Sequence, residues 1–287
     1  MTSPWSDLDR PPLRAAALER ALAVPGGLWT SVRVVGSTGS TNSDLVALAA
    51  SGAPGGAVLI AEEQTSGRGR LDRRWSAPAR SGIFLSMLLR PGSDGAGVPK
   101  ERWGWLPLLV GVAAASALSH TAEVEVRLKW PNDLLVAVGG EERKLGGILA
   151  ELTGDAVVVG LGLNVSLREE ELPVPGAGSL ALAGAPVTDR ETLLRSLLRT
   201  FADLYADWCS SAGDPEGSGL RPAYAAQCAT IGRSVRVELP GDRELLGEAV
   251  AVDGDGRLVV RSADGVERPV GAGDVVHVRP GAEPLKR

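Results

Sequence analysis

The segment 63–75, EQTSGRGRLDRRW, concentrates positive charge on a backbone loosened by Gly67 and Gly69. Its four cationic side chains fall within seven residues and are Arg68, Arg70, Arg73 and Arg74. A guanidinium group keeps its charge permanently and offers paired N–H donors, which match the geometry of carboxylate and phosphate groups. The segment therefore predicts a site for a small anion, and a solvated basic loop is the plain alternative.

Lysine is rare in this chain, which has four lysines against 26 arginines. Two of the four, Lys129 in VRLKW and Lys144 in RKLGG, lie in apolar segments. The lysine ammonium is a compact point charge that can follow a phosphoryl or carboxylate oxygen. We therefore expect both lysines to act at the same anion, with chance placement as the alternative.

Other residue types that carry chemistry are scarce. His120 and His277 are the only histidines, which excludes a multi-histidine metal site, and neither lies near the nucleophile motif that a Ser-His-Asp triad needs. Cys209 and Cys228 are separated by 18 residues, a spacing that fits no zinc site and indicates free thiols in a reducing compartment. We predict no protein metal ligands.

The composition describes a globular protein of 287 residues, long enough for one large domain and a small one. Its net charge of −5 argues against a general nucleic-acid binder. No apolar run approaches the roughly 20 residues that span a bilayer. The N-terminus shows no secretory signal. We expect a cytoplasmic protein with no nucleic-acid or membrane partner.

Apolar periodicity predicts the elements that position these side chains. The arginine segment lies between two apolar runs, 57–62 and 83–89, and is expected to be a long loop between two strands. Another predicted strand, 31–35, leads into a helix with Thr41 or Asn42 as its N-cap. The simpler interpretation is that Ser40, Thr41 and Asn42 only cap this helix. The alternative is that they also contact a polar ligand.

The middle of the chain is predicted to hold a buried helix, 103–121, and then strands within 124–165. Gly146 and Gly147, inside an apolar run, mark the close approach of a neighbouring strand or a ligand. The sequence GLGLN at 160–164 lacks the third glycine and the following helix of a dinucleotide fingerprint, so we reject that function. The aromatic residues of a predicted helix, 191–211, are expected in the core.

The pattern of apolar residues changes near Gly232, from long segments to short ones. Five short alternating segments separated by PGD, DGDG and ADG turns predict a small SH3-like β-barrel. We therefore predict two domains, 1–230, which includes a short N-terminal helix, and 231–287. A single helix before residue 28 is too little for a helix-turn-helix, so no N-terminal DNA-binding domain is expected.

Five motifs occur in order between residues 39 and 165. They are GSTN (39–42), EEQTSGRGR (62–70), LKWPNDLL (128–135), KLGGILAE (144–151) and GLGLNV (160–165). Together they closely resemble the biotin protein ligase family, and GRSVRVEL and DVVHVR are similar to that family's C-terminal domain. The resemblance implies an α+β fold with a mixed, largely antiparallel sheet, as in lipoate ligases and class II aminoacyl-tRNA synthetases.

The resemblance also implies an activity. Such enzymes join biotin to ATP to give biotinyl-5′-AMP, and then transfer biotin to a lysine of a biotin carboxyl carrier domain of a carboxylase. Mg²⁺ would accompany ATP, held mostly by its phosphates. Because the biotin carboxylate itself attacks the α-phosphate, the enzyme needs cations between two anions and no protein nucleophile.

Matched position by position, the resemblance implies roles for particular residues. The catalytic residues would be Lys129, Lys144 and Arg70. The biotin-binding residues would be Ser40, Thr41, Asn42, Gln64, Arg68, Gly69, Arg70, Lys144, Gly146 and Gly147. The ATP-binding residues would be Arg70, Arg73, Trp75, Lys129, Asn132, Asp133, Asn164 and Arg279. Asp274 is a further candidate for a nucleotide contact. Leu71 and Asp72 depart from the family pattern, which puts the loop's closing geometry in doubt.

Two other functions stay open from the sequence alone. A related acyl-adenylate ligase using lipoate or another small carboxylic acid would need the same cations, and only the pocket would distinguish it. A nucleic-acid module or biotin-sensing repressor is disfavoured by the net charge. The oligomeric state, monomer or weak homodimer, is left open.

Overall fold

The computed structural model describes residues 9–71, 73–92, 97–239, 241, 243–271 and 273–278. Among them, a seven-stranded sheet has the order β1-β2-β5-β9-β8-β7-β6. Its strands are β1 (Ser31–Val35), β2 (Ala57–Ala61), β5 (Gly82–Leu89), β6 (Val126–Lys129), β7 (Asp133–Val138), β8 (Glu141–Thr153) and β9 (Ala156–Asn164). The β1–β2 pair is parallel and the others in this sheet are antiparallel. The predicted mixed, largely antiparallel sheet is confirmed.

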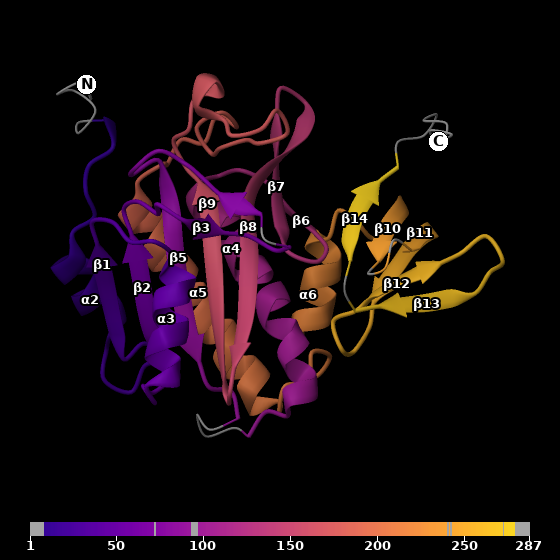
Figure 1. Ribbon diagram of the computed structural model, residues 1–287, viewed down its shortest axis with the longest axis horizontal. Helices are drawn as coiled ribbons and strands as arrows, with labels where there is room; N and C mark the ends of the chain where they lie inside the picture. The colour runs from indigo at the N-terminus through magenta and orange to yellow at the C-terminus, as the bar shows by residue number, and fades with distance from the viewer. Residues whose placement is uncertain are drawn as a thin grey trace.

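Helices cover both faces of this sheet (Figure 1). On one face lie α4 (Leu106–Thr121) and α5 (Arg190–Ser210), and on the other lies α3 (Thr41–Ala50). Two shorter helices, α2 (Ala15–Leu22) and α6 (Leu220–Gln227), complete the layer formed by α4 and α5. The aromatic residues of α5 are buried, as predicted. Helices therefore cover both faces of the sheet, and β5, β8 and β9 also contribute residues to a pocket.

The predicted buried helix 103–121 is divided in the structure. A 3₁₀ helix, η1 (Lys100–Trp105), precedes α4, and a proline lies in the first turn of α4, where its missing N–H has no cost. By length and composition alone, 100–121 could cross a membrane, whereas its apolar run was predicted to be too short. However, 67% of its apolar window is buried inside the protein, as in a core helix.

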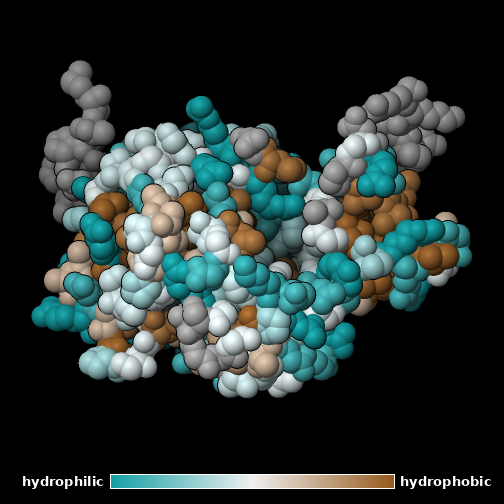
Figure 2. All heavy atoms as spheres, turned by 60° about the horizontal axis from the view of Figure 1, so that its bottom comes forward, coloured by the Kyte–Doolittle hydropathy of each residue, from teal (hydrophilic) through white to brown (hydrophobic). Residues whose placement is uncertain are grey.

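The C-terminal part is a five-stranded antiparallel sheet in the order β13-β12-β11-β10-β14. Its strands are β10 (Ser234–Leu239), β11 (Arg243–Val252), β12 (Leu258–Arg261), β13 (Glu267–Val270) and β14 (Asp274–His277). This arrangement agrees with the predicted SH3-like barrel, whereas the boundary at residue 230 stays a prediction. Hydrophobic surface gathers on the barrel (Figure 2), where Leu246, Val266 and Val276 are exposed.

The turn between β11 and β12 fastens the barrel to the larger sheet. The indole Nε1 of Trp105 donates to the carbonyl of Gly254 at 2.9 Å, and that of Trp130 donates to the carbonyl of Gly256 at 3.0 Å. Both indole rings are buried in one hydrophobic cluster that also contains Val252 and Leu258 of the barrel, and the hydrogen bonds leave neither indole N–H unpaired. Trp130 directly follows β6, and the contact therefore sets the barrel beside the β6–β7 turn.

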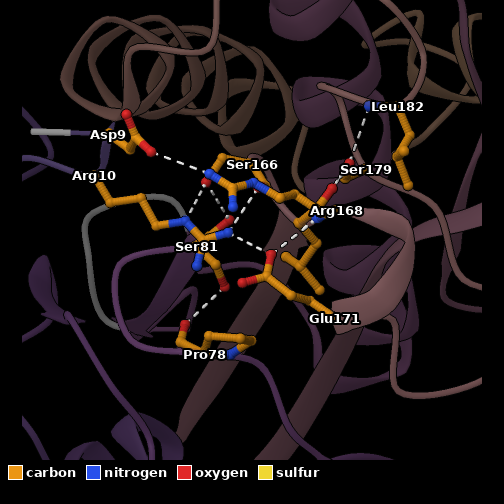
Figure 3. A network of polar contacts seen from close by, with 10 residues as sticks. Asp9, Arg10, Pro78, Ser81, Ser166, Arg168, Glu171, Ser179 and Leu182 are labelled. Carbon is orange, nitrogen blue, oxygen red and sulfur yellow. Dashed lines mark hydrogen bonds and ion pairs between the residues drawn. The ribbon is translucent and has the colours of Figure 1, made fainter. Parts of the chain in front are cut away.

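Charged groups tie residues 9–14 across the ends of β2 and β9. Figure 3 shows the contacts of Asp9 and Arg10 with Ser166, Arg168 and Glu171. Arg10 donates to the hydroxyl of Ser166 at 3.0 Å and pairs with Glu171 at 2.5 Å. Deeper in, Arg190 of α5 pairs with Glu62 at 2.6 Å and donates to the carbonyl of Pro11 at 2.7 Å. The Arg190–Glu62 pair therefore joins α5, the end of β2 and the N-terminal segment.

We expect Arg190→Ala to lower the free energy of unfolding by roughly 3 kcal/mol, because it leaves a buried carboxylate without its cation. The two side chains are only 6% and 9% exposed. Urea unfolding checks this, with Arg261→Ala as control, since the Arg261–Glu267 pair is about half exposed and contributes at most about 1 kcal/mol. Equal unfolding midpoints for the two variants would contradict the assignment.

Candidate active site

A cavity of about 680 Å³ opens between the large sheet, the arginine segment and the barrel. Its size is typical of a site for a small molecule. The sequence-predicted residues that line it are Ser40, Thr41, Asn42, Gln64, Arg68, Gly69, Arg70, Arg73, Trp75, Lys129, Asn132, Asp133, Lys144, Gly147, Asn164 and Asp274. Segments more than 200 residues apart in the chain thus meet at one pocket. The predicted nucleotide contact Arg279 lies outside the described residues.

Gly146 is the exception among the described candidates, because it does not line the pocket. A Cβ atom at Gly146 would lie 2.7 Å from the carbonyl oxygen of Gly162 on β9. The close approach of β9 therefore explains why a glycine occupies position 146. Gly147 faces the pocket, where a Cβ atom would lie 3.5 Å from both Lys144 and Trp75.

One end of the pocket presents neutral hydroxyl and amide groups. Gln64 accepts hydrogen bonds through Oε1 from the backbone N–H of Thr41 at 2.9 Å and from its hydroxyl at 3.1 Å. The N-cap of α3 is Ser40, whose hydroxyl accepts from Ser43 N, and not Thr41 or Asn42 as predicted. Those two residues are already helical, and their side chains turn inward to buried partners. This end suits an uncharged polar ring.

Asn42 is bonded to protein groups on both sides of its amide. Nδ2 donates to the carbonyl of Leu149 at 3.2 Å and to Glu151 at 2.9 Å, and Oδ1 accepts from Ser86 at 2.6 Å. Its predicted contact with a ligand stays a prediction. No role was predicted for Ser86 or Glu151, although a lone serine in the buried run IFLSMLL indicates a hydroxyl that needs a partner.

The other end of the pocket is rich in cations. Lys144 pairs with Asp133 at 2.5 Å, and Lys129 lies directly opposite Asp133 across the β6–β7 pair. Burial lowers the pKa of Lys129, an effect that Asp133 opposes and that Lys144 reinforces. One carboxylate thus faces two lysines. The local charge is not balanced by these three groups.

The arginine segment, residues 63–75, supplies further cations to the pocket wall. It forms a two-stranded ribbon, β3 (Gly67–Arg68) and β4 (Arg74–Trp75), and not the long loop that was predicted. Strands of two residues are too short to leave a periodic pattern in the sequence. Across the ribbon, Gly69 N donates to the carbonyl of Arg73 at 2.7 Å.

Two arginines join this ribbon to the rest of the pocket. Arg70 donates to Asn132 Oδ1 at 3.0 Å and to the carbonyl of Gly273 at 3.2 Å. Burial lowers the pKa of Arg70, with Asp133 opposing that effect. Arg73 pairs with Asp274 on β14, the residue proposed from the sequence as a nucleotide contact. The barrel is therefore part of the pocket wall.

Trp75 lies flat against the floor of the pocket, which is formed by β9. A Cβ atom at Gly162 would lie 2.6 Å from Cε2 of the Trp75 ring, and one at Gly160 would overlap the amide of Asn42. Gly160 and Gly162 are two residues apart and therefore lie on the same face of β9. Because neither has a side chain, this face leaves room for Asn42 and the Trp75 ring. The indole Nε1 of Trp75 is buried and has no hydrogen-bond partner among the described residues.

We expect Gly162→Ala to displace the Trp75 ring and to weaken binding of biotin, the ligand that the resemblance implies. Overpacking typically costs 1–3 kcal/mol, so the Kd should rise by ~10-fold or more. Isothermal titration with biotin measures this, and Gly36→Ala is the control because no atom lies within 4 Å of its added Cβ. Unchanged binding in Gly162→Ala would show that the floor does not need this glycine.

Comparison with known proteins matches both parts of the chain. Residues 34–165 match the Biotin/lipoate A/B protein ligase family, and residues 230–278 match the Biotin protein ligase C terminal domain. The biotin--[acetyl-CoA-carboxylase] ligase of Mycobacterium tuberculosis is 44% identical over 274 residues, which cover 94% of this chain and 97% of that protein. The bifunctional ligase/repressor BirA of Escherichia coli is 34% identical, over 77% of this chain and 66% of BirA.

Solved structures agree with this match. The biotin protein ligase from Aquifex aeolicus in complex with biotin and ATP has a TM-score of 0.70 at 25% identity, covering 86% of this chain and 99% of that one. The fold and the family inferred from the five sequence motifs are both confirmed. This chain is a member of the biotin protein ligase family.

Proposed function

We propose that this protein is an ATP-dependent ligase that activates biotin as biotinyl-5′-AMP and transfers biotin to a lysine of a carboxylase carrier domain. The observation that carries the proposal is one pocket with two chemically different ends. Its neutral end contains Thr41 and Gln64, and its cationic end contains Arg70, Lys129 and Lys144. An uncharged ring with a carboxylate tail and a polyphosphate would together match both ends.

Relatives support the choice of substrates. The Aquifex aeolicus structure is described as a complex with biotin and ATP, and the Mycobacterium tuberculosis relative is named for acetyl-CoA carboxylase. We therefore propose biotin and ATP as small substrates and the biotin carrier domain of such a carboxylase as the protein substrate. The two free cysteines agree with a reducing, cytoplasmic location.

In the first step, a carboxylate oxygen of biotin attacks the α-phosphorus of ATP. A carboxyl–phosphate bond forms, the bond to the β-phosphate oxygen breaks, and pyrophosphate leaves with the electron pair. Two anions must meet, and Lys129 and Lys144 on paired strands, with Arg70 above them, offset their repulsion. Burial already disfavours the charged forms of Lys129 and Arg70, so an incoming anion relieves a cost that the free protein carries.

In the second step, the carrier lysine attacks the acyl carbon as a neutral amine, and AMP leaves. An amide bond forms, the acyl–phosphate bond breaks, and the amine loses a proton to water. The cationic end of the pocket aids this step, because nearby positive charge lowers the pKa of an entering ammonium group. The same cations hold the departing phosphate.

Magnesium would enter the pocket with ATP. No group of three or more His, Cys, Asp or Glu residues that could hold a metal occurs within the part of the chain that the structure describes. In this proposal the ion is held mostly by the phosphates, with Asp133, which lines the pocket, as the candidate protein ligand. When bound, Mg²⁺ neutralises phosphate charge.

The neutral end of the pocket favours biotin over lipoate. The Thr41 and Gln64 groups can pair with the ureido N–H and C=O of biotin, whereas the dithiolane of lipoate offers no N–H donor and no carbonyl. The direct test incubates the protein with ATP, Mg²⁺ and a carrier domain, and measures pyrophosphate release and the mass of the carrier. We expect both signals with biotin and little with lipoate. Equal rates, or no mass increase with biotin, would overturn the proposal.

We expect Arg70→Gly to retain adenylate synthesis, which Lys129 and Lys144 still support, but to release biotinyl-5′-AMP into solution. The substitution removes the hydrogen bonds that join the arginine segment to Asn132 and to the barrel, so the cover over a reactive anhydride loosens. Streptavidin blotting of serum albumin incubated with enzyme, ATP and biotin detects the leak. Arg33→Gly, at an exposed position of β1 that does not line the pocket, is the control. Equal faint labelling by Arg70→Gly and wild type, with adenylate synthesis intact, would contradict this role.

A further inference from the structure

Glu151 contacts two separate parts of the pocket. It lies on β8 two residues beyond Leu149, and side chains at this spacing share one face of the strand. One carboxylate oxygen, Oε2, accepts from Asn42 Nδ2 at 2.9 Å. The other, Oε1, pairs with Arg68 Nη1 at 2.8 Å. A single side chain thus connects α3 to the arginine segment.

Hydrogen bonds continue from Asn42 to the neutral end of the pocket. Asn42 Oδ1 is bonded to the Ser86 hydroxyl at 2.6 Å, and the Ser86 hydroxyl lies 2.7 Å from that of Thr41. Thr41 is bonded in turn to Gln64. A continuous polar chain therefore runs from Arg68 to the group expected to hold the substrate's ring. Ser86 and Asn42 are buried, so this chain is shielded from water along its middle.

Arg68 is positioned by only one of its N–H groups. Nη1 binds Glu151, and within the described part of the chain the structure gives the guanidinium no other polar partner. Arg68 also lines the pocket. Its remaining donors can bind a carboxylate while Nη1 stays on Glu151, because a guanidinium presents donors along more than one edge.

The Arg68–Glu151 pair is poorly suited to stabilising the fold. The Arg68 side chain is 47% exposed and that of Glu151 is 24% exposed. Exposed ion pairs contribute about 0–1 kcal/mol to stability. Holding a long side chain in place before the ligand arrives does reduce the ordering cost of binding. The pair is therefore better explained by ligand binding.

We propose that Glu151 is a positioning residue, which holds Arg68 over the pocket for the substrate's carboxylate and couples it to the neutral end through Asn42. The inference rests on the proposed function, since it assigns the biotin carboxylate to Arg68. Glu151 does not touch the reacting atoms. Its effect must appear in biotin binding and not in the chemical step.

The test compares Glu151→Gln, Glu151→Ala and the control Glu267→Gln, whose 2.8 Å pair with Arg261 lies on the barrel hairpin. Glutamine keeps an oxygen for Asn42 and loses the charge that faces Arg68. Because a charge-assisted hydrogen bond is about twice as strong as a neutral one, we expect Glu151→Gln to raise the KM and the Kd for biotin by ~10-fold. The kcat of pyrophosphate release and the urea midpoint should change little. Glu151→Ala should have a larger effect, and Glu267→Gln none.

An Arg68→Ala background separates positioning from a general effect. If Glu151 acts through Arg68, adding Glu151→Gln to Arg68→Ala should not raise the Kd for biotin further. The same fold-change in both backgrounds, a Kd equal to that of the control, or tighter binding by Glu151→Gln would overturn the inference. Normal biotin-dependent pyrophosphate release by the wild type keeps such a result distinct from failure of the proposed function. Its absence would overturn that function and this inference together.

Discussion

Positive charge that the protein itself does not balance is the constraint on which the site depends. Asp133 faces both Lys129 and Lys144 and also interacts with the guanidinium of Arg70, whose Nη1 lies 3.9 Å from Asp274 Oδ1. Burial disfavours the charged forms of Lys129 and Arg70 and lowers the pKa of both groups. A fold can hold such a cluster only with rigid support, and here strand pairing supplies it for the lysines. The anionic substrates complete the charge balance.

The barrel contributes to this cluster directly. The carbonyl of Gly273 accepts from Arg70, and Asp274 pairs with Arg73, so the C-terminal part fixes two cations of the arginine segment. The indoles of Trp105 and Trp130 hold the barrel at the distance that these contacts require. In the proposed function, the domain interface is therefore part of the active site.

The motifs allowed most of the pocket to be predicted, because residue type and order carry the chemistry. Periodicity also predicted the strands of both sheets and the burial of α4. It did not predict the β3–β4 ribbon, whose strands of two residues depend on pairing across a turn. Ser40 was not predicted as the N-cap, since three consecutive polar residues could each cap and only the inward packing of Thr41 and Asn42 decides.

The partners of the predicted residues were harder to foresee. Glu151 pairs with Arg68 across 83 positions of the chain, and Arg70 reaches Gly273 across 203. No local sequence pattern predicts contacts between residues so far apart in the chain. Gly146 was assigned to a ligand although its neighbour is β9, because a glycine in a strand signals close approach without naming what approaches.

The partly buried cluster of cations has a consequence for stability that a merely structural feature would not have. Burial lowers the pKa of Lys129, so the ammonium form is disfavoured by folding; stability rises as the pH increases through the lowered pKa and towards the unfolded value. Below the lowered pKa, the folded protein carries the full cost. Lys129→Met removes that cost and leaves Asp133 paired with Lys144.

The most direct test is to measure unfolding in urea and the single-turnover rate of biotinyl-5′-AMP formation for Lys129→Met and wild type at pH 7. We expect the free energy of unfolding to stay equal or rise, while the rate falls by ~10²-fold. An unchanged rate together with lower stability would show that Lys129 supports the fold and not the reaction, which would contradict the central claim.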